Sequence, residues 1–512
     1  FDLPARGSSE IALIAPLTGA PQIPDVAQSG TAWVEQQLQT TAAAWHERLD
    51  RVTLKLPPRA RHIADTVRTA LADILITRDG ASLRPGTRSY ARSWIRDGAM
   101  IADGLLRLGD TDAVREYVDW YAPHQFANGK VPCCVDHRGS DPVPENDSHG
   151  ELIHLIAQLY RYSGDRAELE RGWPHISAAI GYMDALRQSE RGDSNRAPGR
   201  EANFGLMPAS ISHEGYSAKP MHSYWDDFWA LTGYKDAVDM ARVLGKDEAI
   251  AAISASRDEF RHDLFASIET ATKARAIDFL PGSAELGDFD ATSATVMLSP
   301  AGEQQALPPD LLHNTFERYW RGFVERSDGA KSWEDYTPYE WRTVGSFVRL
   351  GWRERAQAAI DFFFASGARP LAWNQWAEVV GHDARKPRFV GDMPHGWVAS
   401  DFIRSALDLF AYEREADHSL VLAAGVPASW LDGDGIAIEH LRTPYGELSY
   451  WLRRDGKRVT LRVAGRAQPP GGFVFAKPDA AAAHVRINGG PASSSGGEVR
   501  WGQLPATVLL EE

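Results

Sequence analysis

The sequence predicts a mainly helical protein in which an (α/α)6 barrel, built from six helical hairpins, is followed by a small C-terminal β-sandwich. Two observations lead to this prediction. Glycine-containing turns recur between amphipathic segments in the middle of the chain, and the residues after about 416 change to short segments that alternate apolar and polar positions. A chain of 512 residues with 43% hydrophobic content can bury a large core and form more than one domain.

The helical hairpins are predicted from four similar turns, which read LLRLGD at 105–110, YRYSGD at 160–165, ARVLGK at 241–246 and VRLGW at 348–352. Each turn follows apolar residues at helical spacing, supplies a glycine at a helix C-terminus and leads into another amphipathic segment. Helical periodicity predicts about twelve helices in this region. They cover 61–78, 97–108, 111–123, 147–162, 166–187, 224–243, 247–264, 288–298, 309–325, 339–350, 353–366 and 396–414.

The barrel is therefore expected over 60–416, and the β-sandwich over 417–512. The sandwich is predicted from alternating segments such as GIAIEHL and RVTLRV, which are separated by Gly, Pro and Asp-Gly. Residues 1–30 are rich in Pro, Gly and Ser around one apolar run, which suggests the remnant of an N-terminal β-domain. Residues 31–59 are interpreted as a linker helix.

The composition narrows the classes of partner. Acidic residues outnumber basic ones by 69 to 55, and the resulting charge of −14 disfavours nucleic acid and anionic membranes as partners. No apolar run reaches membrane-spanning length. The 17 Trp and 15 Tyr recur beside carboxylates and amides, which favours a ligand with hydroxyl groups and flat apolar faces.

The cysteines bear on the question of a cofactor, and the first residue bears on the compartment. The two cysteines, Cys133 and Cys134, are neighbours, so we expect neither a disulfide framework nor a zinc motif, and no metal or other cofactor. The chain starts at Phe1 and not at Met, which favours a removed signal peptide and a periplasmic or secreted protein. A cytoplasmic location stays open, as does the oligomeric state.

The stretch MHSYWDDFWALTGY at 221–234 places two adjacent carboxylates among aromatic residues. Tyr224 and Trp225 precede Asp226 and Asp227, and an aromatic wall that withholds water raises the pKa of a carboxyl group. The alternative is structural: two acids at a helix N-terminus, where they favour the helix dipole, with aromatic residues packed in a core.

The stretch SYARSWIRDG at 89–98 contains a second candidate group. Arg96 and Asp97 can hold two sugar hydroxyls by charge-assisted hydrogen bonds, while Trp94 supplies a flat face. A helix cap with a local salt bridge is the alternative.

The stretch PENDSHGE at 144–151 combines structural and functional candidates. Ser148 and Glu151 fit a capping box, whereas Glu145 and Asp147 are candidates for contacts to hydroxyl groups.

Two later stretches are also dense in acids, amides and aromatic residues. The first, WEDYTPYEW at 333–341, is expected to line a cleft through Trp333 and Glu334, although its end could instead start a helix. The second pairs WNQWAE at 373–378 with GDMPHGW at 391–397, and burying so much hydrogen-bonding capacity without a ligand would be costly. Its candidate residues are Trp373, Asn374, Trp376, Glu378, His395 and Trp397.

Glycoside hydrolysis needs two carboxyl groups on opposite sides of the scissile bond, one protonated and one ionised. The sequence offers Asp226 and Asp227 in apolar surroundings and Glu378 among amides. These different environments push the pKa values apart, as acid and base roles require.

The WIRD segment at 94–97, the YWDD segment at 224–227, Glu378 and MPHGW at 393–397 together resemble the six-hairpin glycosidases. This group includes glucoamylases, trehalases and α-L-rhamnosidases, and the resemblance extends over about 60–512, including segments 420–427 and 445–450 of the tail.

The resemblance implies that Arg96 and Asp97 bind a terminal sugar, that Asp226 is the general acid and that Glu378 is the general base. Glucoamylases carry Glu-Glu where this chain has Asp226 and Asp227, whereas related disaccharide phosphorylases and trehalases use Asp in this region. The choice between Asp226 and Asp227 as the acid therefore stays open.

The sequence is interpreted as an inverting, exo-acting glycoside hydrolase that cleaves an oligosaccharide or glycoside with water and without a cofactor. Three alternatives were weighed: a sugar phosphorylase on the same barrel, a polysaccharide lyase, and a non-catalytic glycan-binding protein. The sugar, its anomer and its linkage are not readable from the sequence.

Overall fold

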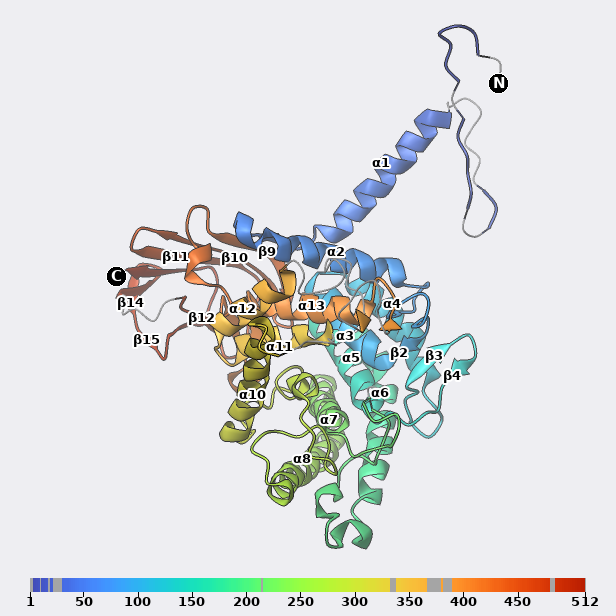
Figure 1. Ribbon diagram of the computed structural model, residues 1–512, viewed down its shortest axis with the longest axis vertical. Helices are drawn as coiled ribbons and strands as arrows, with labels where there is room; N and C mark the ends of the chain where they lie inside the picture. The colour runs from blue at the N-terminus through green and yellow to red at the C-terminus, as the bar shows by residue number, and fades with distance from the viewer. Residues whose placement is uncertain are drawn as a thin grey trace. The chain divides into compact units, whose positions relative to one another are not determined.

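The computed structural model describes residues 3–9, 11–16, 19–21, 30–212, 215–331, 338–365, 379–380, 389–478 and 484–511 (Figure 1). The chain divides into two compact units, Phe1–Arg51 and Val52–Glu512. The first unit contains helix α1 (Gly30–Leu49), none of whose residues is buried. The second unit contains the other helices and all the described strands.

The second unit is built around two rings of helices that alternate along the chain. The outer helices bury one face each and are α2 (Arg61–Thr77), α4 (Thr111–Tyr121), α6 (Arg166–Ser189), α8 (Asp247–Arg275), α10 (Pro309–Ser327) and α12 (Arg353–Phe364). The inner helices are buried over most of their length and are α3 (Ile95–Arg107), α5 (Ser148–Ser163), α7 (Tyr224–Leu244), α9 (Ala291–Ala294), α11 (Trp341–Arg349) and α13 (Gly396–Asp408).

Contacts between consecutive inner helices close the ring, because α13 packs against α3 as well as against α11. The six outer–inner pairs make an (α/α)6 barrel, and the predicted fold class is confirmed. The predicted glycine turns are present too: Gly164 and Gly245 end α5 and α7 in the left-handed conformation, with φ of 68° and 67°.

Two glycines allow α5 and α7 to approach closely. A Cβ atom on Gly150 would overlap the backbone carbonyl of Trp229, and one on Gly233 would lie 2.7 Å from Cα of Gly150. The close packing brings the first turns of α5 and α7 together, and these turns carry several candidate site residues.

Two helix ends lie more than five residues from the predicted ones, and the helix predicted over 288–298 is only α9 followed by a 3-10 helix over Thr295–Met297. Helix α8 continues to Arg275, beyond the predicted end at 264, because no Gly or Pro interrupts the segment. Helix α13 ends at Asp408, and the segment predicted as its last turn forms strand β7 (Ala411–Arg414). β7 pairs in antiparallel fashion with β8 (Ser419–Leu422), so sheet pairing satisfies its backbone groups in place of helical hydrogen bonds.

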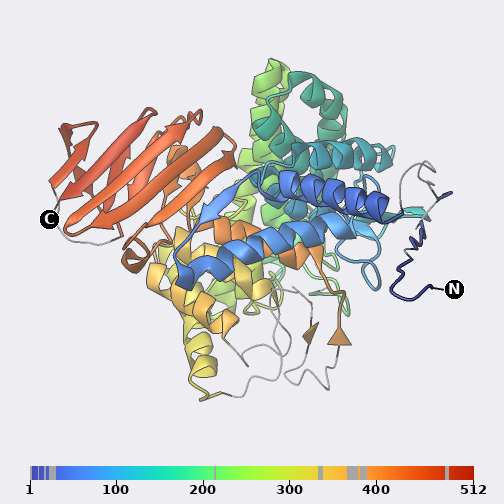
Figure 2. The same ribbon diagram turned by 90° about the horizontal axis from the view of Figure 1, so that it is seen from above.

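The C-terminal part forms two sheets (Figure 2). The seven-stranded sheet has the order β1-β9-β10-β11-β17-β13-β14, and the five-stranded sheet has the order β15-β16-β12-β8-β7. The strands not yet given are β1 (Thr53–Lys55), β9 (Ile436–Thr443), β10 (Gly446–Asp455), β11 (Arg458–Gly465), β12 (Phe473–Ala476), β13 (His484–Ile487), β14 (Gly490–Ala492), β15 (Ser494–Ser495), β16 (Glu498–Trp501) and β17 (Ala506–Glu511).

Alternate residues of β10 face the apolar interior of this β-sandwich, as the sequence pattern predicted. Leu448, Tyr450 and Leu452 are fully buried, as is Phe475 of β12. The first strand, β1, comes from the segment just before the barrel and pairs with β9.

Two small sheets lie within the barrel region: β2 (Ser93–Trp94), β3 (Cys134–Asp136) and β4 (Gly139–Ser140) form one, and β5 (Val379–Val380) and β6 (Phe389–Val390) form the other.

Across the helices that the structure describes, none combines the length and the apolar character needed to cross a membrane.

Candidate active site

The predicted site residues that the structure describes gather at the N-terminal ends of the inner helices. Arg96 lies in the first turn of α3, Asp147 immediately precedes α5, Asp226 lies in the first turn of α7, and Trp397 begins α13. Segments far apart in the sequence therefore contribute to one group of side chains.

Arg96 holds the centre of this group. Its Nη1 donates to Oε2 of Glu145 at 2.6 Å and to Oδ2 of Asp147 at 2.8 Å, and its side chain is buried. Burial alone would lower the pKa of Arg96, but Glu145, Asp147 and Glu151 raise it well above its usual range. Asp97, the next residue, is also buried.

Asp147 connects three inner helices. The oxygen that accepts from Arg96 also accepts from Nε1 of Trp225 at 2.9 Å, so that α3, the start of α5 and α7 are joined at one carboxylate. Trp225 is thereby fixed beside the Arg96 network.

Asp226 faces the same network and is fully buried. Oγ of Ser210 donates to its Oδ2 at 2.5 Å, while Oδ1 has no hydrogen-bond partner among the described residues. Burial, and then the negative charge of Asp147, raise the pKa of Asp226 well above its ordinary value. The pKa of Asp226 is therefore shifted in the direction that favours the protonated form, and one of its oxygens is uncommitted.

Asp227 has different surroundings because one residue along a helix turns the side chain by about 100°. Its Oδ1 accepts from the backbone N–H of Met207 at 2.8 Å. Burial raises the pKa of Asp227 to about 8, against the lowering effects of the Met207 N–H and of His222. His222 in turn hydrogen-bonds to Glu285 at 2.5 Å, so Asp227 lies toward a separate ion pair.

Tyr224 does not join the Arg96 network through its hydroxyl group. That hydroxyl lies 2.8 Å from Oγ of Ser267 on outer helix α8. The next residue, Trp225, points instead to Asp147. The structure thus separates two aromatic residues that the sequence placed in the same group.

Helices α11 and α13 supply a cationic and aromatic wall. The Trp397 ring lies near two guanidinium groups, 5.5 Å from Arg96 and 4.9 Å from Arg342, and 4.6 Å from the Tyr339 ring. Arg342 is held by Asp401, which accepts from its Nε at 2.7 Å. In the part of the chain that the structure describes, Nε1 of Trp397 has no hydrogen-bond partner.

His395 caps α13, where its Nδ1 accepts from the backbone N–H of Val398 at 3.4 Å. Burial lowers the pKa of His395 to about 4, so the imidazole is neutral at pH 7. Its ring lies 5.0 Å from that of Tyr90, which in turn lies 6.0 Å from Trp94.

Asp392 anchors this wall to the segment before β2. Its carboxylate accepts three consecutive backbone N–H groups, from Arg88 at 2.7 Å, Ser89 at 2.7 Å and Tyr90 at 3.0 Å. Burial would raise the pKa of Asp392, but these hydrogen bonds lower it below its ordinary value. An ionised carboxylate therefore fixes where Tyr90 and His395 meet.

Part of the predicted site lies outside the described residues. These residues are Trp333, Glu334, Trp373, Asn374, Trp376 and Glu378.

The capping box predicted at Ser148 and Glu151 is wrong. Ser148 is the first residue of α5, and its hydroxyl has no partner among the described residues. Glu151 points into the barrel and is fully buried, where burial and Asp147 raise its pKa well above the ordinary value. The capping box does not form because α5 is an inner helix, whose first turn faces other helices and not solvent.

Three residues of the site were not predicted: Ser210, Glu151 as a buried acid, and Arg342. Arg342 directly follows the stretch at 333–341 that was singled out, but its partner Asp401 lies 59 residues further along the chain. A local sequence pattern cannot indicate a contact between residues so far apart in the chain.

No family model matches the chain, and no curated protein sequence matches it. Solved structures do. An α-L-rhamnosidase from Dictyoglumus thermophilum matches with a TM-score of 0.60 and 12% identity, over 90% of this chain and 50% of that one. A Streptomyces avermitilis α-L-rhamnosidase, solved with L-rhamnose, matches with a TM-score of 0.56 and 13% identity, over 90% of this chain and 42% of that one.

A rhamnosidase from a Bacillus species matches with a TM-score of 0.55 and 11% identity, over 81% of this chain and 42% of that one. The chain therefore spans half or less of the length of these three proteins. At this identity the likeness establishes the fold, and it agrees with the barrel and β-domain described above.

Proposed function

We propose that the protein is an inverting, exo-acting glycoside hydrolase in which Asp226 is the general acid and Glu378 the general base. The observation that carries the proposal is Asp226 itself: a fully buried carboxyl group with a raised pKa, one uncommitted oxygen and a place beside the Arg96 network. Such a group can hold a proton at neutral pH and deliver it to a glycosidic oxygen.

The surroundings support Asp226 over Asp227 in this role. Asp147 lies close enough to Asp226 to disfavour its ionisation, and the same carboxylate binds Arg96 and Trp225. Asp227 is occupied by the Met207 N–H and lies near His222. Protonated Asp226 would donate its proton as the bond to the leaving group breaks, and the ionised base would take a proton from the attacking water.

The polar groups at the helix N-termini suit a terminal sugar. Arg96 and the carboxylates of Asp97, Glu145 and Asp147 offer donors and acceptors for neighbouring hydroxyl groups, and Trp397 offers a flat face. Because the matching folds are those of α-L-rhamnosidases, an α-L-rhamnoside is the first substrate to test.

The decisive experiment compares Asp226→Asn with Asp227→Asn on two leaving groups. The Asp226→Asn variant should lose about 10²-fold or more in kcat on an unactivated disaccharide. It should lose much less on a dinitrophenyl glycoside, whose leaving group needs no proton. Asp227→Asn should show no such dependence on the leaving group. If Asp226→Asn loses equally on both substrates, Asp226 is not the acid.

Stereochemistry tests the single-displacement mechanism. The first product, followed by proton NMR, should have the opposite anomeric configuration to the substrate, and Glu378→Gln should reduce turnover by about 10²-fold or more. Retention of configuration, or full activity of Glu378→Gln, would refute this part of the proposal.

A further inference from the structure

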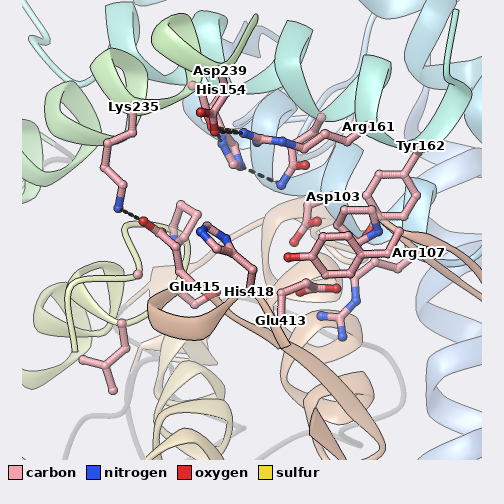
Figure 3. A pocket seen from close by; sticks show the side chains of 18 of the residues that line it. Asp103, Arg107, His154, Arg161, Tyr162, Lys235, Asp239, Glu413, Glu415 and His418 are labelled. Atoms are coloured by element: carbon pink, nitrogen blue, oxygen red, sulfur yellow. Dashed lines mark hydrogen bonds and ion pairs between the residues drawn. The ribbon is translucent and has the colours of Figure 1, made fainter. Parts of the chain in front are cut away.

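A second candidate site lies at the opposite end of the inner helices. A cavity of about 420 Å³ is lined by the C-terminal parts of α3, α5 and α7, the loop 298–302, and residues of the β-sandwich (Figure 3). Arg107, which lines it, is roughly 16 Å further along α3 than Arg96, from a helical rise of 1.5 Å per residue. The cavity is thus separate from the candidate active site, and its volume is in the range of small-ligand pockets.

Most of the charged groups of this cavity neutralise one another. The carboxylate of Asp236 forms ion pairs with Nη2 of Arg161 and with Nδ1 of His154, each at 2.6 Å. Lys235 lies 3.0 Å from Glu303, which lines the adjoining surface. A charged ligand would have to displace one of these pairs, which disfavours it.

Two further cations of the lining, Arg107 and Arg349, are also paired. Asp408 accepts from Arg107 at 2.9 Å and from Arg349 at 2.8 Å. Arg107 in addition donates to the backbone oxygens of Arg404 and Ala411. Both of these arginines are thus already paired with a buried carboxylate, which favours a neutral ligand over an anionic one.

Four polar side chains of the lining have capacity to spare: Gln158, Tyr162, Glu413 and Tyr445. Within the described residues, Oε1 of Gln158 has no partner, and no other side chain hydrogen-bonds to the hydroxyls of Tyr162 and Tyr445 or to the carboxyl of Glu413. Figure 3 shows Tyr162 and Glu413 close to one another, together with Asp103 and Arg107, on one side of the cavity. Burial raises the pKa of Glu413, although Arg107 and Arg349 oppose the shift.

This combination of features suits hydroxyl groups. A hydroxyl both donates and accepts a hydrogen bond, and the lining offers donors and acceptors side by side with two tyrosine rings. We propose that the cavity between the barrel and the β-sandwich binds a neutral saccharide unit, through Glu413, Tyr162, Tyr445 and Gln158, at a site separate from the candidate active site.

The test measures sugar binding in the full chain carrying Asp226→Asn, so that turnover does not consume the ligand. The probes are L-rhamnose, D-glucose, D-galactose and maltose, followed by saturation-transfer NMR and calorimetric titration. In this background, Tyr445→Phe and Glu413→Gln should each weaken binding of the responding sugar about tenfold, as expected for one lost hydrogen bond.

A matched control is Tyr412→Phe, which removes a hydroxyl at the position beside Glu413 but outside this cavity. The affinity of this control for the responding sugar should equal that of the Asp226→Asn protein. Thermal unfolding should show that all three variants fold. With Asp226 restored, Tyr445→Phe should hydrolyse a small aryl glycoside within about twofold of the unmodified protein, because the two sites are far apart.

The outcomes separate this proposal from the proposed function. Binding that is weakened by Tyr445→Phe and Glu413→Gln supports the second site even if no glycoside is hydrolysed. Binding of none of the four sugars, equal binding by all variants, or a preference for glucuronate or phosphate over neutral sugars would overturn it.

Discussion

The two ends of the inner helices contain carboxyl groups whose pKa values are shifted in opposite directions. At the N-terminal end, burial raises the pKa values of Asp226 and Asp227. At the C-terminal end, burial has the same tendency, but Arg404 and Arg107 lower the pKa of Asp103, and Arg161 and His154 lower that of Asp236 to about 2.

Helix dipoles alone would give the reverse pattern, since carboxylates are favoured at helix N-termini and disfavoured at C-termini. The number of nearby cations decides instead. At the N-terminal end, Arg96 is shared by Glu145 and Asp147 and lies near Glu151 and Asp97, whereas Asp236 contacts two cationic partners, Arg161 and His154, each at 2.6 Å. The pKa values of Asp226 and Asp227 are therefore raised at the end where carboxyl groups exceed their cationic partners.

Replacing the shared cation should give the largest effect. In Arg96→Met, Glu145 and Asp147 would stay buried without their partner, which costs about 3–5 kcal/mol of unfolding free energy. Urea denaturation at pH 7 measures the loss. The matched control is Arg242→Met, which removes an exposed arginine whose pair with Asp239 is worth about 1 kcal/mol or less. Equal losses in the two variants would contradict the role given to Arg96.

The pH dependence of stability should distinguish the two ends. The pKa of Asp227 is about 8 in the folded protein and near 4 when unfolded, so the folded state holds an extra proton between these values. Its contribution to stability is complete below about pH 4 and is lost as the pH rises toward 8. In unfolding experiments from pH 4 to 8, Asp227→Asn should lose less stability than the unmodified protein. If the slope of the unfolding free energy against pH is the same in both proteins, Asp227 is ionised throughout.

Asp236 should act in the opposite direction. Its pKa is about 2 in the folded protein, below the unfolded value near 3.9, so its contribution is present above about pH 4 and is lost as the pH falls toward 2. The contribution is about 2.6 kcal/mol, from the difference between these pKa values. Between pH 4 and 2, the free energy of unfolding should fall less steeply for Asp236→Asn than for the unmodified protein. If the two proteins lose stability in parallel, the assignment is refuted.

The anchor at Asp392 should give the smallest change in stability. Asp392→Asn keeps one acceptor oxygen but loses the charge and the second acceptor for the three N–H groups, at a cost of about 1.5 kcal/mol. Thermal unfolding measures this loss. Tyr90 fluorescence and the His395 NMR signal should change as well, and signals identical to those of the unmodified protein would argue against an anchoring role.

The sequence predicted most of the barrel because its signals are local. The glycine turns and the helical spacing located most helices from 61 to 364 closely, apart from the end of α8 and the short α9, and the aromatic surroundings singled out Asp226. Strand β7 was missed because Ala411–Arg414 has a composition that suits either a helix or a strand. Its state is set by pairing with β8.

The site was predictable where one segment carries both the acid and its surroundings, and not where helices must meet. Glu145 and Asp147 were recognised as polar candidates, but their shared partner Arg96 lies 49 and 51 residues earlier. Arg342 and the inward direction of Glu151 depend on which helix faces which, and the ring of helices determines that only after folding.

Strand β1 has a consequence for how the chain can be divided. Lys55 reaches Glu439 across 384 residues with a 2.8 Å hydrogen bond, so the edge of the C-terminal sheet is supplied by residues synthesised long before the rest of that sheet. A fragment that begins at residue 60 would leave the outer side of β9 bare, and such an open edge invites pairing with another molecule. Recombinant versions of this protein should therefore keep Thr53–Lys55, and limited proteolysis between barrel and sandwich should release no piece that stays soluble by itself.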